Sequence, residues 1–128
     1  MLKIQCVTFD SENPIIPAKF WSEVLGWQIV IENSEEVVVE NPDGQSDLLF
    51  LKNPDKRVVK NRIHFDLRPD DQLAEVARLE SLGAKKVEIG QSADPRTTWV
   101  VMEDPEGNLF CVLRALDKPE IKKYELSQ

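Results

Sequence analysis

The 128-residue sequence is poor in the features that mark several large classes of protein. It contains two cysteines, Cys6 and Cys111, and one histidine, His64. Two cysteines cannot build the disulfide framework of a small secreted domain. No apolar run approaches the roughly 18 residues of a transmembrane helix, and the amino terminus lacks the apolar core of a signal peptide. We therefore expect a cytoplasmic protein with reduced thiols and no membrane contact.

Basic residues are the minority among the charged ones. The chain has 16 Lys and Arg against 23 Asp and Glu, which gives a net charge of -7 and a pI near 4.8. A surface of this sign repels phosphate backbones, so the composition argues against a nucleic-acid partner. Hydrophobic residues make up 41% of the chain, which is enough for the core of one ordinary domain.

A proline and glycine turn that leads into an apolar strand occurs twice. The segment Asp104–Asn108 (DPEGN) precedes Leu109–Arg114, and the segment Asn41–Gly44 (NPDG) precedes the apolar run Leu48–Leu51. Proline fixes its own φ, glycine permits a positive φ, and Asp or Asn can hydrogen-bond the local backbone. Each segment therefore predicts a tight turn followed by a strand, and the repetition indicates a duplicated structural unit.

Both halves of the chain predict the same order of elements: strand, helix, two strands, turn and a last strand. In the first half, the strands are expected over residues 3–10, 27–32, 36–40 and 47–52, with a helix that ends at Gly26. In the second half, they are expected over residues 62–68, 85–89, 97–103 and 109–114, with a helix from about residue 70 to Gly83.

Both predicted helices show an apolar side. In the first, Phe20 and Trp21 are expected to pack in the core. In the second, Glu75 and Arg78 are expected to pair on the wet side. The apolar stripe of this second helix is predicted to consist of Leu73, Val76, Ala77 and Leu79.

These elements fit one domain over residues 1–128. It divides into a first module (about 3–52), a linker (53–61), a second module (about 62–114) and a tail (115–128) in which Pro119 starts a candidate short helix. A helix across one face of a sheet leaves the other face free, and two such sheets can enclose a cavity. A ligand site is therefore expected between the modules.

Several sequence motifs occur in an order that is similar to a known family. They are Phe20-Trp21, Leu25-Gly26-Trp27, residues 61–67 (NRIHFDL), Leu82-Gly83-Ala84 and residues 99–113 (WVVMEDPEGNLFCVL). Together they resemble the glyoxalase-like domains of the vicinal oxygen chelate superfamily, which also contains glyoxalase I, bleomycin-resistance proteins and extradiol dioxygenases. The resemblance covers about residues 3–115. It implies an α+β fold of two tandem βαβββ modules, which form a curved, half-open antiparallel barrel around a central cavity, and commonly a homodimer.

The resemblance also implies where a metal would bind. Enzymes of the superfamily hold one divalent ion through side chains from the first and last strand of each module. The matching positions here are Gln5, His64 and Cys111, and the fourth lies within residues 48–51, which are all Leu or Phe. One amide, one imidazole and one thiol are a poor ligand set for a divalent ion. We therefore expect no metal and no cofactor.

Besides Gln5, four side chains are candidates for the site, each with a structural alternative. His64 is the natural general acid or base, or a satisfied polar group. Asp66 lies on the same strand face and either orients the imidazole or balances a nearby arginine, Arg68 or Arg114. Cys111 is a thiolate nucleophile if strand pairing brings it beside His64, or otherwise a small hydrophobe. Trp99 stacks on a ligand or packs in the core.

Two functions follow from these candidates. The first is a protein that binds a small organic ligand in the cavity between its modules without metal, as bleomycin-resistance proteins do, through Gln5, Trp99 and Cys111. The second is a lyase, isomerase or oxygenase that uses His64 as general acid or base, with Asp66 beside it. The negative charge and the incomplete metal ligands favour binding.

Overall fold

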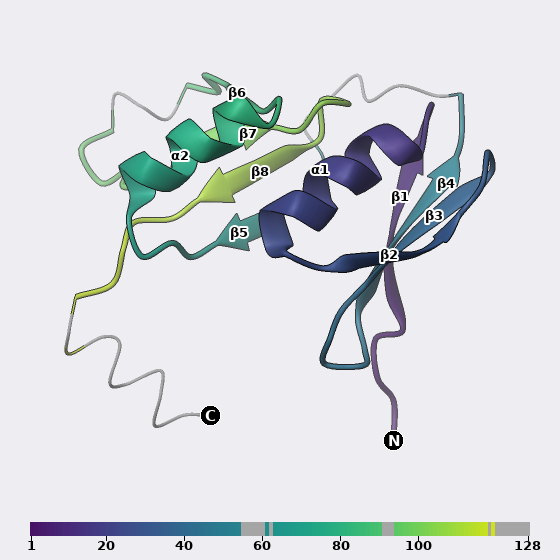
Figure 1. The fold of residues 1–128 in the computed structure, drawn as a ribbon. Helices are drawn as coiled ribbons and strands as arrows, with labels where there is room; N and C mark the ends of the chain where they lie inside the picture. Colours follow the sequence, from purple (N-terminus) through teal and green to yellow (C-terminus); the bar gives the residue numbers. More distant parts are fainter. Residues whose placement is uncertain (55–60, 62, 91–93, 118, 120–128) are drawn as a thin grey trace. The chain divides into compact units, whose positions relative to one another are not determined.

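The computed structural model describes residues 1–54, 61, 63–90, 94–117 and 119. The chain forms two compact units: Met1–Arg62 with Asp104–Asn108, and Ile63–Glu103 with Leu109–Gln128. Within the described residues, each unit contains one sheet of four strands and one helix of 10 or 11 residues (Figure 1). The predicted α+β fold of two βαβββ modules is confirmed. Residues 55–60 of the predicted linker and residues 120–124 of the candidate helix that starts at Pro119 lie outside the described residues.

The first unit has the predicted element order. Its elements are β1 (Cys6–Ser11), α1 (Ile15–Leu25), β2 (Gln28–Glu32), β3 (Glu36–Glu40) and β4 (Asp47–Lys52). The strand order is β1-β4-β3-β2, with β1 parallel to β4 and the other neighbours antiparallel. The sheet is thus mixed, not wholly antiparallel. The helical crossover makes β2 run in the same direction as β1, and two further reversals then make β4 parallel to β1.

The second unit repeats this topology. Its elements are β5 (Phe65–Leu67), α2 (Gln72–Ser81), β6 (Lys85–Lys86), β7 (Val100–Glu103) and β8 (Leu109–Val112). The strand order is β5-β8-β7-β6, and β5 is parallel to β8. Its strands are shorter than the sequence predicts, although the Val87 N–H donates to the Val101 carbonyl at 2.9 Å and extends the β6 pairing. The duplication inferred from the two turns is therefore confirmed.

Helix α1 supplies the aromatic core of the first unit. It ends at Gly26, whose φ of 70° is the left-handed conformation that glycine adopts without strain. Phe20 and Trp21 are 4% and 1% exposed, as predicted. The Phe9 ring lies 6.4 Å from the Trp21 ring and 4.8 Å from the Phe50 ring, centroid to centroid. The side of β1 that carries Phe9 therefore packs under the helix.

Helix α2 begins with a side-chain cap. The Asp71 carboxylate accepts a hydrogen bond from the Ala74 N–H at 3.0 Å, which satisfies one of the free donors of the first turn. On the exposed side, Arg78 and Glu75 form the predicted ion pair at 3.1 Å. Within the described part of the chain, neither α2 nor any other helix has the length and apolar character needed to cross a membrane.

The buried stripe of α2 is narrower than predicted. Val76 and Leu79 are 4% and 2% exposed and pack toward the sheet, whereas Leu73 is 81% exposed and Ala77 is exposed as well. The prediction was wrong for Ala77 because it lies about 100° around the helix from Val76. Leu73 lies in the first turn of the helix, and its side chain meets solvent instead of the sheet.

The turn Asp104–Asn108 belongs to the first unit, although it connects β7 to β8. Asp104 is 2% exposed, and its Oδ1 accepts hydrogen bonds from the N–H groups of Glu106 and Asn108, both at 2.9 Å. Its Oδ2 accepts from the Asn108 side chain at 2.9 Å and from the Trp21 indole N–H at 3.0 Å. The turn chemistry is as predicted, and the bond to Trp21 adds a contact that the sequence did not reveal.

The two faces of the second sheet carry different residues. Strand pairing aligns Phe65, Phe110 and Met102 across three strands, and Phe110 and Met102 are 1% and 0% exposed. Because side chains alternate along each strand, Asp66 and Cys111 lie on the opposite face. Helix α2 packs on β6 and β8. We infer that it covers the apolar face, which leaves the Asp66 face free of the helix.

Candidate functional site

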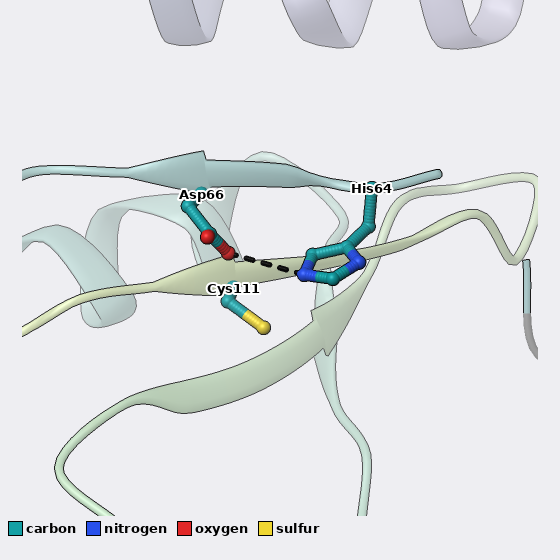
Figure 2. A group of neighbouring side chains, drawn as sticks. All are labelled: His64, Asp66 and Cys111. Atoms are coloured by element: carbon teal, nitrogen blue, oxygen red, sulfur yellow. Dashed lines mark ion pairs between the residues drawn. The ribbon is translucent and has the colours of Figure 1, made fainter. Parts of the chain in front are cut away.

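The pairing of β5 with β8 brings three reactive side chains together. Asp66 is the direct partner of Cys111 in the parallel register. His64 precedes Asp66 by two residues and therefore shares its face. Figure 2 shows the three side chains converging, with the carboxylate directed at the imidazole. One imidazole nitrogen, one carboxylate oxygen and the sulfur all lie within 4.8 Å of one another.

The carboxylate of Asp66 holds the imidazole of His64. The distance from His64 Nε2 to Asp66 Oδ1 is 3.2 Å, and the two side chains are 35% and 53% exposed. Cys111 is more covered than its two neighbours. Of the two alternatives for Asp66, the structure shows the contact with the imidazole. Arg68 instead donates from Nη1 to the Arg114 carbonyl at 2.7 Å.

This geometry allows proton transfer at the sheet surface. A neutral imidazole carries its proton on one nitrogen and accepts a proton at the other. When the Nε2 proton faces the Asp66 carboxylate, the Nδ1 atom of His64 is the acceptor. In this tautomer the site can take a proton from a bound ligand, and the carboxylate can stabilise the resulting imidazolium.

The other two predicted residues are not members of this cluster. Trp99 is half-buried and stands immediately before β7. Gln5 is exposed and precedes β1 in the first unit, where its carbonyl accepts the Asp47 N–H at 3.1 Å. Strand alternation places the Gln5 side chain on the same side as Phe9. The ligand contacts expected for Gln5 and Trp99 remain predictions.

Comparison with known proteins identifies the family. A glyoxalase-like domain model matches residues 6–113. The chain belongs to the glyoxalase-like domain family. This glyoxalase-like domain is also 30% identical over 140 aligned residues to Glyoxalase 1 of Caenorhabditis elegans. That alignment covers 95% of the chain and 47% of the relative, so the chain spans about half the length of the curated relative that it matches.

Solved structures share this fold. A glyoxalase/bleomycin resistance protein/dioxygenase family enzyme from Burkholderia phytofirmans PsJN is 18% identical, with a TM-score of 0.68 over 90% of this chain and 100% of that one. The bleomycin-binding protein of Streptomyces verticillus is 16% identical, with a TM-score of 0.58 over 91% and 100%. At these identities the glyoxalase-like domain shares a fold with both proteins, and the likeness extends no further.

The four-ligand metal site implied by the superfamily does not fit this glyoxalase-like domain. In β4, Leu48 and Phe50 are 3% and 0% exposed and form part of the core of the first unit. The carboxylate at the start of the strand, Asp47, accepts the Asn41 N–H through Oδ1 at 2.8 Å and so serves the preceding turn. The last strand of the first module therefore supplies hydrocarbon where a donor is needed. That the protein binds no metal remains a prediction.

Sequence reasoning underestimated the proximity of Asp66 to Cys111. Asp66 was expected beside His64 or an arginine, and Cys111 beside His64, so no contact between Asp66 and Cys111 was predicted. Their adjacency depends on the register of β5 against β8, which joins residues 45 positions apart in the chain. No local pattern specifies that register. The turn at Asp104–Asn108 fixes where β8 begins, and it was the one signal that could have suggested the pairing.

Proposed function

We propose that this glyoxalase-like domain binds a small organic ligand in the cavity predicted from its sequence, without the usual metal of the superfamily. The observation that carries the proposal is the convergence of His64, Asp66 and Cys111 on the sheet face opposite Phe110. A few polar groups that converge on an apolar framework are typical of small-molecule sites. The homodimer and the cytoplasmic location expected from the sequence are part of the same proposal.

Binding without turnover is supported by the fold and by the ligand set. The protein from Streptomyces verticillus is described as binding bleomycin, and TnmS3 from Streptomyces sp. CB03234, 16% identical with a TM-score of 0.59, is described as an antibiotic-binding protein. Both show that the fold can hold organic molecules. In the present chain, the apolar side chains of Leu48–Leu51 in β4 leave the first module without the ligand that its last strand would supply.

A thermal-shift titration tests the binding function. Bleomycin, a catechol and a thiol adduct of an α-keto aldehyde are the probes, and one of them is expected to raise the melting temperature in a saturable way. At a ligand concentration 100 times the Kd, the added stability is about 2.7 kcal/mol. His64→Ala is expected to weaken this response because the imidazole is a central polar group of the site.

Leu73→Ala is the matched control, since Leu73 is 81% exposed on α2, the helix that we infer covers the other face of the sheet. Its titration curve should follow that of the wild type. If the His64→Ala and wild-type curves coincide for every probe that binds, the ligand site lies elsewhere.

The alternative function is an enzyme in which His64 is the general acid or base. The contact of its Nε2 with Asp66 favours this role because the carboxylate holds the ring in place and stabilises its protonated form. For any substrate that the protein turns over, His64→Ala is expected to lower kcat about 10²- to 10⁴-fold. The melting temperature should change little because the side chain is 35% exposed. If His64→Ala fails to fold, the histidine is structural.

A further inference from the structure

We propose that Cys111 is a nucleophilic thiol that captures soft carbon electrophiles, with His64 as its base and Asp66 as the residue that positions His64. The chemical class of ligand is an α,β-unsaturated carbonyl compound. The inference rests on the proposed function, because the electrophile must reach the same sheet face. It goes beyond that function by naming a covalent step and the atom that performs it.

The two cysteines of the chain have different neighbours. Neither Cys6 nor Cys111 forms a disulfide, and both are half-buried. Cys6 lies in β1, which is parallel to β4, and Cys111 lies in β8, which is parallel to β5. Cys6 pairs with Asp47, and the first unit has no histidine, because His64 is the single histidine of the chain. Cys111 has an imidazole nitrogen and a carboxylate oxygen within 4.8 Å of its sulfur. A thiol becomes a strong nucleophile when an adjacent base removes its proton, so only Cys111 has the partners for activation.

The order of the three groups suits this activation. Asp66 contacts Nε2 of His64 at 3.2 Å, and Figure 2 shows this nitrogen on the side of the ring that faces Cys111, so Nε2 is the base when the neutral ring carries its proton on Nδ1. The carboxylate also stabilises the imidazolium that forms when the ring takes the thiol proton. The limit of 4.8 Å exceeds a hydrogen bond, but such contacts are commonly looser before a ligand closes the site.

The covalent step is a balanced addition. The imidazole accepts the thiol proton, and the thiolate sulfur forms a bond to the β-carbon of the ligand. The π electron pair of the carbon–carbon double bond moves toward the carbonyl to give an enolate. The imidazolium then returns the proton to the α-carbon. The product contains every atom of both reactants, no group leaves, and neither an oxidant nor a reductant is needed.

Competitive alkylation of the two thiols in the full-length native protein tests the proposal. Iodoacetamide and 2-cyclohexen-1-one are the probes, and peptide mass spectrometry measures the modification of Cys6 and Cys111 in the same sample. Cys111 is expected to react at least about tenfold faster than Cys6. In urea, where the neighbours are dispersed, the two rates should agree within about twofold. Equal rates in the native protein would overturn the proposal.

Variants separate activation from simple exposure. His64→Gln and Asp66→Asn are expected to lower the rate at Cys111 to that at Cys6, and Asp66→Glu should restore part of it because a carboxylate is again within reach. Cys6→Ser is the control and should leave the rate at Cys111 unchanged. Melting temperatures close to that of the wild type will show that the variants are folded. If folded His64→Gln reacts at the wild-type rate, the imidazole is not the base.

Two further measurements distinguish the remaining outcomes. If the protein binds one equivalent of Zn²⁺ tightly, the metal protects Cys111 from alkylation, and Asp66→Asn removes the binding, then the cluster is a metal centre and the thiol proposal fails. Reversible binding of a probe by Cys111→Ala in the thermal-shift titration supports the proposed function independently of the covalent step. If Cys111 is alkylated selectively but no probe gives a saturable thermal shift, the thiol proposal is supported and the proposed binding function is not.

Discussion

Replacement of Asp104 by alanine is expected to lower the free energy of unfolding by about 3–5 kcal/mol, because it leaves buried hydrogen-bond donors without an acceptor. The carboxylate is 2% exposed and accepts hydrogen bonds from two backbone N–H groups, the Asn108 side chain and the Trp21 indole. Chemical denaturation followed by tryptophan fluorescence and circular dichroism measures the loss. The fluorescence signal includes Trp21 itself, so its native environment should change as well.

Asp94→Ala is the matched control for this prediction. Asp94 also precedes a proline and also accepts a backbone hydrogen bond, from the Arg96 N–H at 2.9 Å, but its side chain is 39% exposed. Its replacement is expected to cost less than about 1 kcal/mol because water can satisfy the exposed groups. If the two variants lose similar stability, the hydrogen bonds of Asp104 do not have the importance that their burial indicates.

The second large effect is expected at Phe110, the residue next to the candidate thiol. Phe110 is 1% exposed and lies on the apolar face of the second sheet, so Phe110→Ala should destabilise the protein by about 3–5 kcal/mol through lost burial and a cavity. Cys111→Ala removes one sulfur atom from the opposite, half-buried side and should cost about 1 kcal/mol or less. Denaturant titration of the two variants compares neighbouring positions on opposite faces of one strand.

This contrast also tests the assignment of the sheet faces. A larger loss for Cys111→Ala than for Phe110→Ala would mean that the thiol lies in the packed core. The candidate site would then be a structural cluster. The expected result, in contrast, leaves Cys111→Ala folded and suitable for the binding measurements.

The sequence predicts the elements that depend on local chemistry. Gly26 ends α1 because a positive φ suits glycine, and the Asp104–Asn108 turn forms because its own side chains satisfy its backbone. The strands of the first half are correct within a few residues because β-branched and apolar residues alternate there. The shared topology of the two units then follows from the same signals repeated in the same order.

Features that depend on long-range contacts could not be predicted from the sequence. The bond between Trp21 and Asp104 joins residues 83 positions apart, and alternation in one strand contains no information about its partner. The exposure of Leu73 depends on how far α2 extends over its sheet. In the candidate site, alternation alone placed His64 and Asp66 on one face. Placing Cys111 beside them requires the register of β5 against β8, which pairs residues 45 positions apart.

The hydrogen bond between Trp21 and Asp104 has a consequence for biosynthesis. Residues 1–62 are synthesised before Asp104, so until the turn is made the Trp21 indole N–H has no Asp104 carboxylate to which it can donate. A buried donor without an acceptor is costly, and the aromatic core around Trp21 therefore reaches its final packing only after the later turn has been translated. The amino-terminal half is thus made first but matures late, together with the strand that carries Cys111.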